Sequence, residues 1–279
     1  MTGGLCGQPS TNLLVFSGFN ATEGDNMSKV VLVTGASRGI GRDTAMLAAE
    51  RGYQVAVNYV SNRAKAEEVV AEIANAGGTA ALFPGDVAKR DEVRHLFAEI
   101  DRRFGRLDAL VNNAGVGFTQ GRLDTTKPED LVATFEVNVF GLFYCLQEAV
   151  LRMSTRHGGK GGAIVNISSA AARNGGPGAY IDYAGSKAAV DIITTGLAKE
   201  VGGEGIRVNA VRPGVTETDM VQYMRDADPQ FLQQVVKTMP MGRIGEVREI
   251  SHCILWLLSD EASYVTGSII DASGGRATP

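Results

Sequence analysis

Residues 30–41 read Val-Val-Leu-Val-Thr-Gly-Ala-Ser-Arg-Gly-Ile-Gly, and this stretch decides the fold. The apolar run 30–33 predicts a strand that is buried on both faces, and a helix is expected to begin at Gly39. Between them, Gly35 permits a tight turn, Gly39 lets the backbone approach a pyrophosphate, and Gly41 lets the helix lie close to the sheet. The amide groups and the dipole at the helix start favour a phosphate. The stretch therefore predicts a dinucleotide-binding turn.

Beyond this turn, short apolar runs alternate with longer stretches of helical period. This alternation, without a break in composition, predicts a Rossmann-type α/β fold: one doubly wound parallel sheet of about seven strands with helices on both faces. Residues 27–279 are expected to form a single dinucleotide-binding catalytic domain, and residues 1–26 a disordered extension. Further strands are expected over 54–59, 79–84, 107–111, 163–167, 206–211 and 268–271, and helices over 39–51, 63–76, 89–104, 128–156, 179–201 and 246–258.

The composition excludes several classes of protein. The chain of 279 residues carries 27 Lys and Arg against 31 Asp and Glu, a net charge of −4, which disfavours binding to nucleic acid through phosphates. No apolar run is long enough to cross a bilayer, so no membrane partner is expected. Cys6, Cys145 and Cys253 are far apart and share no ligand spacing with the histidines. No disulfide framework and no metal site are therefore expected, and a reducing, cytoplasmic location fits best.

The segment after the second strand indicates which dinucleotide binds. It reads Asn58-Tyr-Val-Ser61-Asn-Arg63 and has no acidic side chain that would bind the ribose hydroxyls and repel a 2′-phosphate. Together with Arg38 in the glycine turn, this segment predicts a preference for NADP(H), with NAD(H) possible. Two interpretations of Arg63 stay open, a contact to the 2′-phosphate and a solvated residue at a helix start.

Tyr183 and Lys187 are the candidate proton-transfer pair. They are four residues apart on an expected helix, so both project from one face. The pKa of a free tyrosine is about 10, and a neighbouring ammonium is expected to lower it. The preceding strand ends in Ser168-Ser169, which brings a hydroxyl to the same edge of the sheet, where it can bond a substrate oxygen as charge develops.

Five motifs together resemble the short-chain dehydrogenase/reductase family over residues 29–275. Within the family, the chain looks most like bacterial reductases of the 3-oxoacyl-carrier-protein reductase and glucose 1-dehydrogenase types. The motifs are Gly35-x3-Gly39-x-Gly41, Asp86-Val87, Asn112-Asn113-Ala114-Gly115, Tyr183-x3-Lys187 and Arg212-Pro213-Gly214.

The resemblance implies a catalytic set of Ser169, Tyr183, Lys187 and Asn138. The family serine usually precedes its tyrosine by thirteen residues, whereas Ser169 precedes Tyr183 by fourteen, so one residue is inserted and Ser168 is the alternative. Tyr180 lies seven residues before Lys187, as in the enoyl-reductase branch, but Tyr183 fits the four-residue spacing better. Asn138 matches the family asparagine that holds a water connecting Lys187 to solvent. The alternative interpretation is that Asn138 is a polar residue inside a helix that faces a neighbouring element.

The resemblance also implies an activity: hydride transfer between NADP(H) and a small-molecule carbonyl or secondary alcohol, in a homotetramer or a homodimer. Tyr183 would give or take the hydroxyl proton, and residues 217–240 would cover the substrate. The alternative is a catalytically silent redox sensor that binds the nucleotide, although an intact proton relay counts against it. The expected cofactor contacts are Gly35, Ser37, Arg38, Gly39, Ile40, Asn58, Ser61, Asp86, Val87, Asn113, Ala114, Gly115, Tyr183, Lys187, Pro213, Gly214, Val215 and Thr216.

Overall fold

A computed structural model of the chain describes Met1 and residues 28–117, 121–218, 221–222, 225–226 and 230–276. Apart from Met1, the extension predicted over 1–26 lies outside these residues. So do Met220, Tyr223 and Met224, which belong to the predicted substrate cover.

The described strands form one parallel sheet in the order β3-β2-β1-β4-β5-β6-β7, which confirms the predicted α/β fold. The central strand β1 is continuously apolar and fully buried, as a strand covered on both faces must be. The bounds are β1 Val30–Val33, β2 Gln54–Tyr59, β3 Thr79–Pro84, β4 Ala109–Asn112, β5 Gly162–Ile167, β6 Ile206–Pro213 and β7 Ile269–Ala272.

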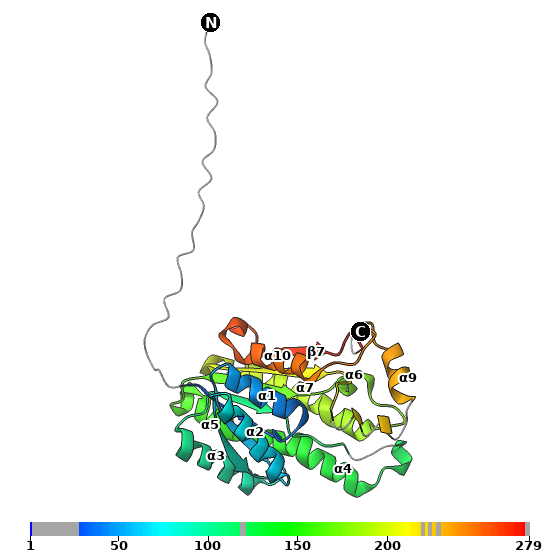
Figure 1. Cartoon of the computed structure of the whole chain (residues 1–279), viewed down its shortest axis with the longest axis horizontal. Coiled ribbons are helices and arrows are strands. Elements are labelled where there is room, and N and C mark those ends of the chain that lie inside the picture. Colours follow the sequence, from blue (N-terminus) through cyan, green and yellow to red (C-terminus); the bar gives the residue numbers. More distant parts are fainter. Residues whose placement is uncertain (2–27, 118–120, 219–220, 223–224, 227–229, 277–279) are drawn as a thin grey trace.

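Two layers of helices cover the sheet (Figure 1). Alternate residues of β1 enter two separate cores, with Val31 and Val33 in one and Val30 and Leu32 in the other. The first core is closed by α1 (Gly39–Glu50), α2 (Arg63–Asn75) and α10 (Val247–Leu258). The second is closed by α3 (Arg90–Phe104), α5 (Leu142–Met153) and α7 (Ile181–Val201).

Shorter helices complete the described part of the chain. α4 contacts α7, and α6 precedes α7 directly in the chain. Their bounds are α4 Pro128–Phe135, α6 Ala171–Asn174 and α9 Phe231–Lys237, with 3-10 helices over Leu123–Thr125, Thr155–His157, Gly202–Glu204 and Asp260–Ala262.

The long helix predicted over 128–156 is interrupted. Between α4 and α5 the chain makes a π-helical segment, Glu136–Gly141, and α5 ends at Met153. The end is fixed by Ser154, whose Oγ accepts from the amide of Arg156, and by Gly159, where a Cβ would lie 2.4 Å from the carbonyl oxygen of Met153. Single π turns inside α-helices are frequent at functional sites, and this one carries Asn138.

The strand order places the candidate site. From β1 the chain runs outward to β2 and β3, then returns to add β4 on the other side. Ligands of doubly wound sheets bind at such a reversal, beyond the carboxyl ends of the strands. Here the reversal lies between β1 and β4, which end at the glycine turn and at Asn112. Within the described ranges, every helix is too short or too polar to cross a lipid bilayer.

Candidate active site

The glycine turn after β1 has a shape that side chains would block. Gly35 and Gly39 have φ values of +62° and +55°, the left-handed region that favours glycine. At Gly41 a Cβ would lie 2.6 Å from the carbonyl oxygen of Gly35 and 2.4 Å from Nδ2 of Asn113, so no side chain fits. The turn thus brings bare backbone to the start of α1, where amide groups are open to an anion.

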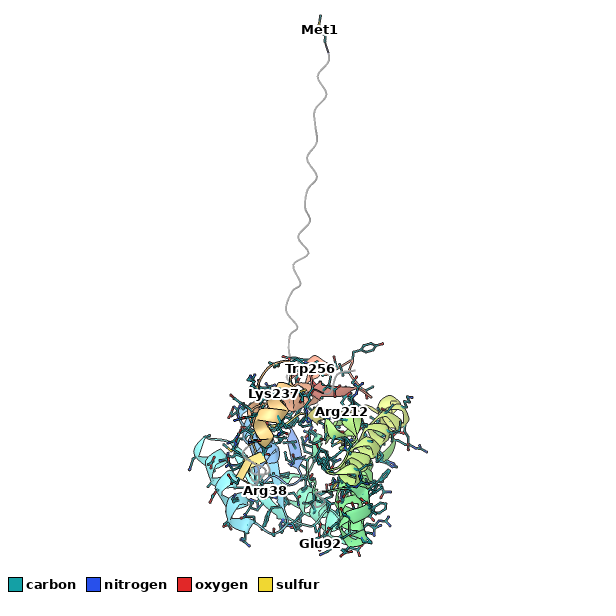
Figure 2. The ribbon with its side chains drawn as sticks, turned by 90° about the vertical axis from the view of Figure 1, so that its right-hand side faces the viewer. Met1, Arg38, Glu92, Arg212, Lys237 and Trp256 are labelled. Carbon is teal, nitrogen blue, oxygen red and sulfur yellow. The ribbon has the colours of Figure 1, made fainter. Side chains whose placement is uncertain are left out.

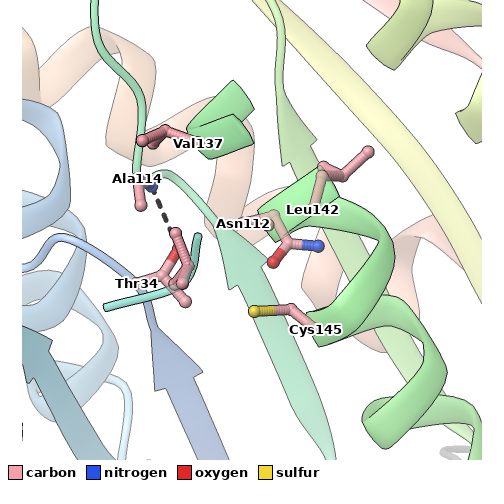
Figure 3. A pocket seen from close by; sticks show the side chains of 8 residues that line it. Thr34, Asn112, Ala114, Val137, Leu142 and Cys145 are labelled. Carbon is pink, nitrogen blue, oxygen red and sulfur yellow. Dashed lines mark hydrogen bonds between the residues drawn. The ribbon is translucent and has the colours of Figure 1, made fainter. Parts of the chain in front are cut away.

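The segment after β4 holds this turn in place. The amides of Asn113 and Ala114 both donate to Oγ1 of Thr34, each at 3.0 Å. Nδ2 of Asn113 donates to the carbonyl oxygens of Thr34 and Gly35, at 2.9 and 3.1 Å. Figure 3 shows the Ala114–Thr34 bond beside a small pocket also lined by Asn112 and Cys145. The glycine turn and the Asn112-Asn113-Ala114-Gly115 motif therefore form one hydrogen-bonded unit at the reversal of the sheet.

Asn58 occupies a different place from the one expected. It is fully buried and presents no exposed surface, so the structure gives it a supporting role, and its expected contact with the cofactor stays a prediction. Its Oδ1 accepts from the amide of Gly35 at 3.2 Å, and its Nδ2 donates to the carbonyl oxygens of Phe83 and Gly85 at 3.1 and 3.0 Å. Asn58 lies beneath the turn and ties it to the end of β3.

The residues expected near the 2′ position of the adenosine ribose differ in the side chains with which they interact. Arg63 is exposed and donates from Nε to Glu67 at 2.7 Å, an arrangement that favours the interpretation as a solvated residue at a helix start. Arg38 caps α1, is exposed, and makes no ion pair with any residue that the structure describes. Ser61 is exposed as well. Arg38 is labelled in Figure 2, together with Lys237 at the end of α9.

Asp86 and Val87 border the other side of the glycine turn. Val87 is buried against Gly141 of the π-helical segment, where a Cβ would lie 2.9 Å from Cγ2 of Val87. Oδ1 of Asp86 accepts from the amide of Ala88 at 3.0 Å, and Asp86 is only partly buried. This loop therefore has a fixed backbone and a carboxylate that reaches the surface.

Beyond β5, the two serines have separate roles. Ser168 is buried and donates from Oγ to the carbonyl oxygen of Lys187 at 3.1 Å. Ser169 is half-buried, and its hydroxyl lies close enough to hydrogen-bond the phenol of Tyr183. Helix α6 follows, and Gly175 ends it with a φ of +73°. The structure therefore brings Ser169 rather than Ser168 to the tyrosine.

Burial sets the acidity of Tyr183. The pKa of its phenol is raised above 10, mainly because burial penalises the phenolate, whereas the hydrogen bond with Ser169 lowers it by less. The lowered pKa expected from the sequence is therefore wrong for this structure. The physical reason is position: Nζ of Lys187 lies over the face of the tyrosine ring, 5.7 Å from its centroid, and not at the phenol oxygen.

Lys187 is a buried cation with few partners. Only 4% of its surface is exposed, and Nζ donates to the carbonyl oxygen of Ile167 at 2.8 Å. A Cβ at Gly115 would lie 3.1 Å from this Nζ, so glycine there leaves the ammonium its space. Burial lowers the pKa of Lys187 to about 8, and the charge of Asp191 opposes this shift. The ammonium is therefore close to losing its proton near neutral pH.

Asn138 reaches the catalytic helix through other side chains. Its Oδ1 accepts from the amide of Val116 at 2.8 Å, and its Nδ2 donates to the carbonyl oxygen of Val116 and to Oγ of Ser186, at 2.8 and 2.9 Å. Ser186 donates in turn to the carbonyl oxygen of Tyr183 at 2.7 Å. Asn138 thus lies at the site, facing a neighbouring segment, and none of these bonds joins it directly to Lys187.

The loop after β6 faces the site from the opposite side. Pro213 accepts from the amide of Ala170 at 2.9 Å, which fixes the Ser169 segment to the end of β6. Thr216 is buried and pairs as an isolated bridge with Gly245. A Cβ at Gly39 would lie 3.7 Å from Cγ2 of Thr218, so this loop comes close to the glycine turn. Gly214 and Val215 lie between these points, as a cofactor cover requires.

Four further residues at the site were not identified as functional from the sequence. Tyr180 packs edge-on against Tyr183, with ring centroids 6.1 Å apart, and its ring lies against Gly176. The signal for it was present, because Gly175-Gly-Pro-Gly178 allows the tight approach of this loop. The other three are Ser186, Asp191 and the side chain of Arg212. A signal was present for two of them, because Asp191 follows Lys187 by four residues and Arg212 opens the Arg212-Pro213-Gly214 motif.

The described residues contain no group of three His, Cys, Asp or Glu side chains that could hold a metal ion. Burial raises the pKa of the Cys145 thiol to about 12, so this cysteine is a core residue rather than a nucleophile. At the carboxyl end of β5, the structure brings together the hydroxyl of Ser169, the phenol of Tyr183 and the ammonium of Lys187.

Comparisons with known proteins identify the family of the chain. A family model described as Enoyl-(Acyl carrier protein) reductase matches residues 35–277. The uncharacterized oxidoreductase YgfF of Escherichia coli is 49% identical over 88% of this chain and 99% of its own length. An uncharacterized oxidoreductase of Thermotoga maritima is 42% identical over 88% of this chain and 96% of its own. The 3-oxoacyl-[acyl-carrier-protein] reductase FabG of Staphylococcus aureus is 39% identical over 89% and 98%.

The fold and the site define an oxidoreductase with a doubly wound dinucleotide-binding sheet. The chain belongs to the short-chain dehydrogenase/reductase family, as the sequence motifs indicated.

Replacing Asn58 tests whether it supports the turn or contacts the cofactor. Asn58→Ala leaves a buried amide and two buried carbonyl oxygens without partners, so we expect the free energy of unfolding to fall by about 2–4 kcal/mol. Affinities for NADPH and NADH are expected to fall by the same factor. Urea unfolding and fluorescence titration measure the two effects.

Asn62→Ala is the matched control, because Asn62 is exposed and only caps α2. Its expected cost is about 1 kcal/mol. Wild-type stability of Asn58→Ala, combined with a loss of NADPH affinity alone, would contradict the buried role of Asn58.

Proposed function

We propose that the protein is an NADP(H)-dependent oxidoreductase that interconverts a carbonyl and a secondary alcohol on a small molecule. The observation that carries the proposal is the convergence of Ser169, Tyr183 and Lys187 at the carboxyl end of β5, beside the open glycine turn. A single catalytic domain over residues 27–279 is part of this proposal. The cytoplasmic location stays a prediction from cysteine usage.

The residues present fit a nicotinamide dinucleotide. Two glycines at the site have no room for a side chain. A Cβ at Gly41 would clash with the glycine turn, and a Cβ at Gly115 would crowd the ammonium of Lys187, so bare backbone faces the place proposed for the cofactor. When bound, the cofactor supplies or accepts the hydride. The residues proposed to hold it are Gly35, Ser37, Arg38, Gly39, Ile40, Ser61, Asp86, Val87, Asn113, Ala114, Gly115, Tyr183, Lys187, Pro213, Gly214, Val215 and Thr216.

Tyr183 is proposed to act on the oxygen of the substrate. Its raised pKa keeps the phenol protonated at neutral pH, so it is a proton donor there, which suits reduction of a carbonyl. Ser169, next to the phenol, is proposed to donate a hydrogen bond to the same oxygen and to orient it as negative charge develops. Lys187 is proposed to hold the cofactor ribose and to stabilise the phenolate that remains after proton transfer. Asn138 is proposed to hold the water that links Lys187 to solvent.

The preference for NADP(H) rests on Arg38. Its side chain is exposed at the start of α1 and is not engaged by the described acidic residues. A guanidinium there can form paired hydrogen bonds with a 2′-phosphate, and the segment after β2 carries no carboxylate to repel it.

The substrate class follows less directly from the site. Tyr180 and Gly176 form one wall beside Tyr183, and Gly117 lies against the tyrosine ring on another, where a Cβ would be 3.2 Å away. One relative is named a 3-oxoacyl-[acyl-carrier-protein] reductase, so 3-oxoacyl thioesters belong in the first substrate screen. Ketones, quinones and aldoses complete that screen, with both cofactors.

A homotetramer, with a homodimer as the alternative, is the proposed assembly. Large apolar side chains on the outer faces of α5 and α7 are exposed, with exposed fractions of 42% for Phe143, 52% for Leu151 and 69% for Ile192. They line one groove together with Leu146 and Leu197. Apolar area of this kind is stabilised when a second copy covers it.

Tyr183→Phe tests the reaction. Removing the hydroxyl removes the proposed proton donor, so we expect turnover to fall by about 100-fold or more on every carbonyl in the screen. NADPH binding should persist, because the ring and Lys187 remain. Absorbance of NADPH at saturating substrate measures turnover, and fluorescence titration measures binding.

Tyr180→Phe is the control, since its hydroxyl is not assigned a proton. It should keep turnover within about tenfold of wild type. Full turnover by Tyr183→Phe would contradict the proposal, and wild-type binding of NADPH without turnover of any substrate would favour the redox sensor.

Arg38→Gln tests the choice of cofactor. Loss of a charged contact to the 2′-phosphate should weaken NADPH binding by about tenfold or more and leave NADH binding nearly unchanged. Arg63→Gln is the matched control, because Arg63 is paired with Glu67, and it should change neither affinity by much. Equal weakening of both cofactors in Arg38→Gln, or tighter binding of NADH by the wild type, would contradict this assignment.

A further inference from the structure

Lys187 needs its charge for the role proposed above, and burial works against that charge. The ammonium is 4% exposed and has one hydrogen bond to a neutral carbonyl oxygen, that of Ile167. A buried cation with so little compensation loses its proton easily. A nearby negative charge would oppose that loss, and the neighbourhood of Lys187 identifies one.

Asp191 provides that charge. It lies four residues after Lys187 on α7, so both project from the same face of the helix. Only 8% of Asp191 is exposed. Its Oδ2 accepts from Nε of Arg212 at 2.9 Å, whereas its Oδ1 is buried and has no hydrogen-bond partner. Arg212 therefore pairs with this carboxylate through Oδ2, and Oδ1 lies inside the protein without a hydrogen bond of its own.

Arg212 holds the carboxylate in a fixed place. Besides Asp191, it contacts Asp271 of β7, with Nη1 of Arg212 3.4 Å from Oδ1 of Asp271. Oδ2 of Asp271 in turn accepts from Nη1 of Arg173 at 3.3 Å. These ion pairs join α7, β6, β7 and α6. Arg212 itself directly precedes Pro213 and Gly214, which are proposed to cover the cofactor. Asp191 is thus anchored by the same strand that closes the site.

Other elements around Lys187 present neutral groups. β5 presents the carbonyl oxygen of Ile167 and the hydroxyl of Ser168, and the π-helical segment presents the amide of Asn138. On its own helix, Lys187 faces Tyr183 and Asp191. Among the described residues, Asp191 is the acidic side chain that acts on Lys187, and its charge raises the pKa of the lysine against the effect of burial.

We propose that Asp191 is a positioning residue that keeps Lys187 in its charged form, and that Arg212 fixes Asp191 for this purpose. The proposal rests on the proposed function for the meaning of that charge, although the electrostatic effect itself does not depend on turnover. Neither the catalytic set nor the cofactor contacts predicted from the sequence includes Asp191 or the side chain of Arg212.

Direct titration of Lys187 tests the proposal. The full-length protein is labelled with 15N at the lysine side chains, and the Nζ signal of Lys187 is assigned by its loss in Lys187→Met. In the wild type, the signal is expected to titrate near pH 8. In Asp191→Asn, the midpoint is expected to move down by about one pH unit, because the negative charge that raises the pKa of Lys187 is lost.

Two variants control for structural damage. Asp191→Glu keeps the charge and should keep the midpoint near that of the wild type, whereas Asp271→Asn removes the other carboxylate from Arg212 and should also leave it there. If Asp191→Asn does not fold, the double variant Asp191→Asn/Arg212→Met removes the whole pair without leaving a buried unpaired cation. A smaller downward shift is expected there, because the positive charge of Arg212 is lost together with the negative charge of Asp191.

The outcomes separate this proposal from the proposed function. An unchanged Lys187 midpoint in Asp191→Asn, or an equal shift in Asp271→Asn, overturns the role of Asp191 whether or not the enzyme turns over. A downward shift confined to the Asp191 variants that lose the charge supports it. In a turnover assay, the alkaline limb of the pH–rate profile should move down by the same amount in Asp191→Asn. A limb that does not move while the Lys187 midpoint shifts would contradict the proposed role of Lys187 in turnover and leave the effect of Asp191 on Lys187 supported.

Discussion

The burial of the Lys187 ammonium is the constraint on which the site depends. A charged group removed from water is costly unless neighbouring atoms replace the solvent. Here the carbonyl oxygen of Ile167 replaces part of it, Gly115 leaves room for it, and Asp191 supplies opposite charge. These three come from β5, from the segment after β4 and from α7 itself. The cation is therefore stable only where the sheet and this helix meet in their observed register.

Hydrogen bonds between side chains and backbone give the cofactor region its shape. Asn58 and Asn113 hold the glycine turn from β2 and β4, and Asn138 holds the segment at Val116 against α7. Each amide satisfies donors and acceptors that a loop would otherwise leave unpaired in a buried setting. As a result, the turn is held in one conformation although it contains glycines.

Much of the fold and the centre of the site could be predicted from the sequence, because they depend on local patterns. The apolar run 30–33 predicts a central strand, and the spacing of Tyr183 and Lys187 depends only on helix geometry. The environment of each group could not be predicted in this way. Asn58 is buried beside β3, where it bonds the carbonyl oxygen of Phe83. The pKa of Tyr183 is raised by its burial in the folded protein. The π-helical segment at Asn138 likewise lies against α7, a contact between distant parts of the chain that local sequence patterns do not indicate.

The central claim, that the Lys187 cation is required for hydride transfer, is tested most directly by Lys187→Met. Methionine fits the buried space and removes the charge, and Lys199→Met on the exposed surface of the same helix is the control. The measurement is the single-turnover rate of NADPH oxidation with a substrate found in the screen. The account predicts a fall of about 100-fold or more for Lys187→Met and a wild-type rate for Lys199→Met. A wild-type single-turnover rate for Lys187→Met would contradict it.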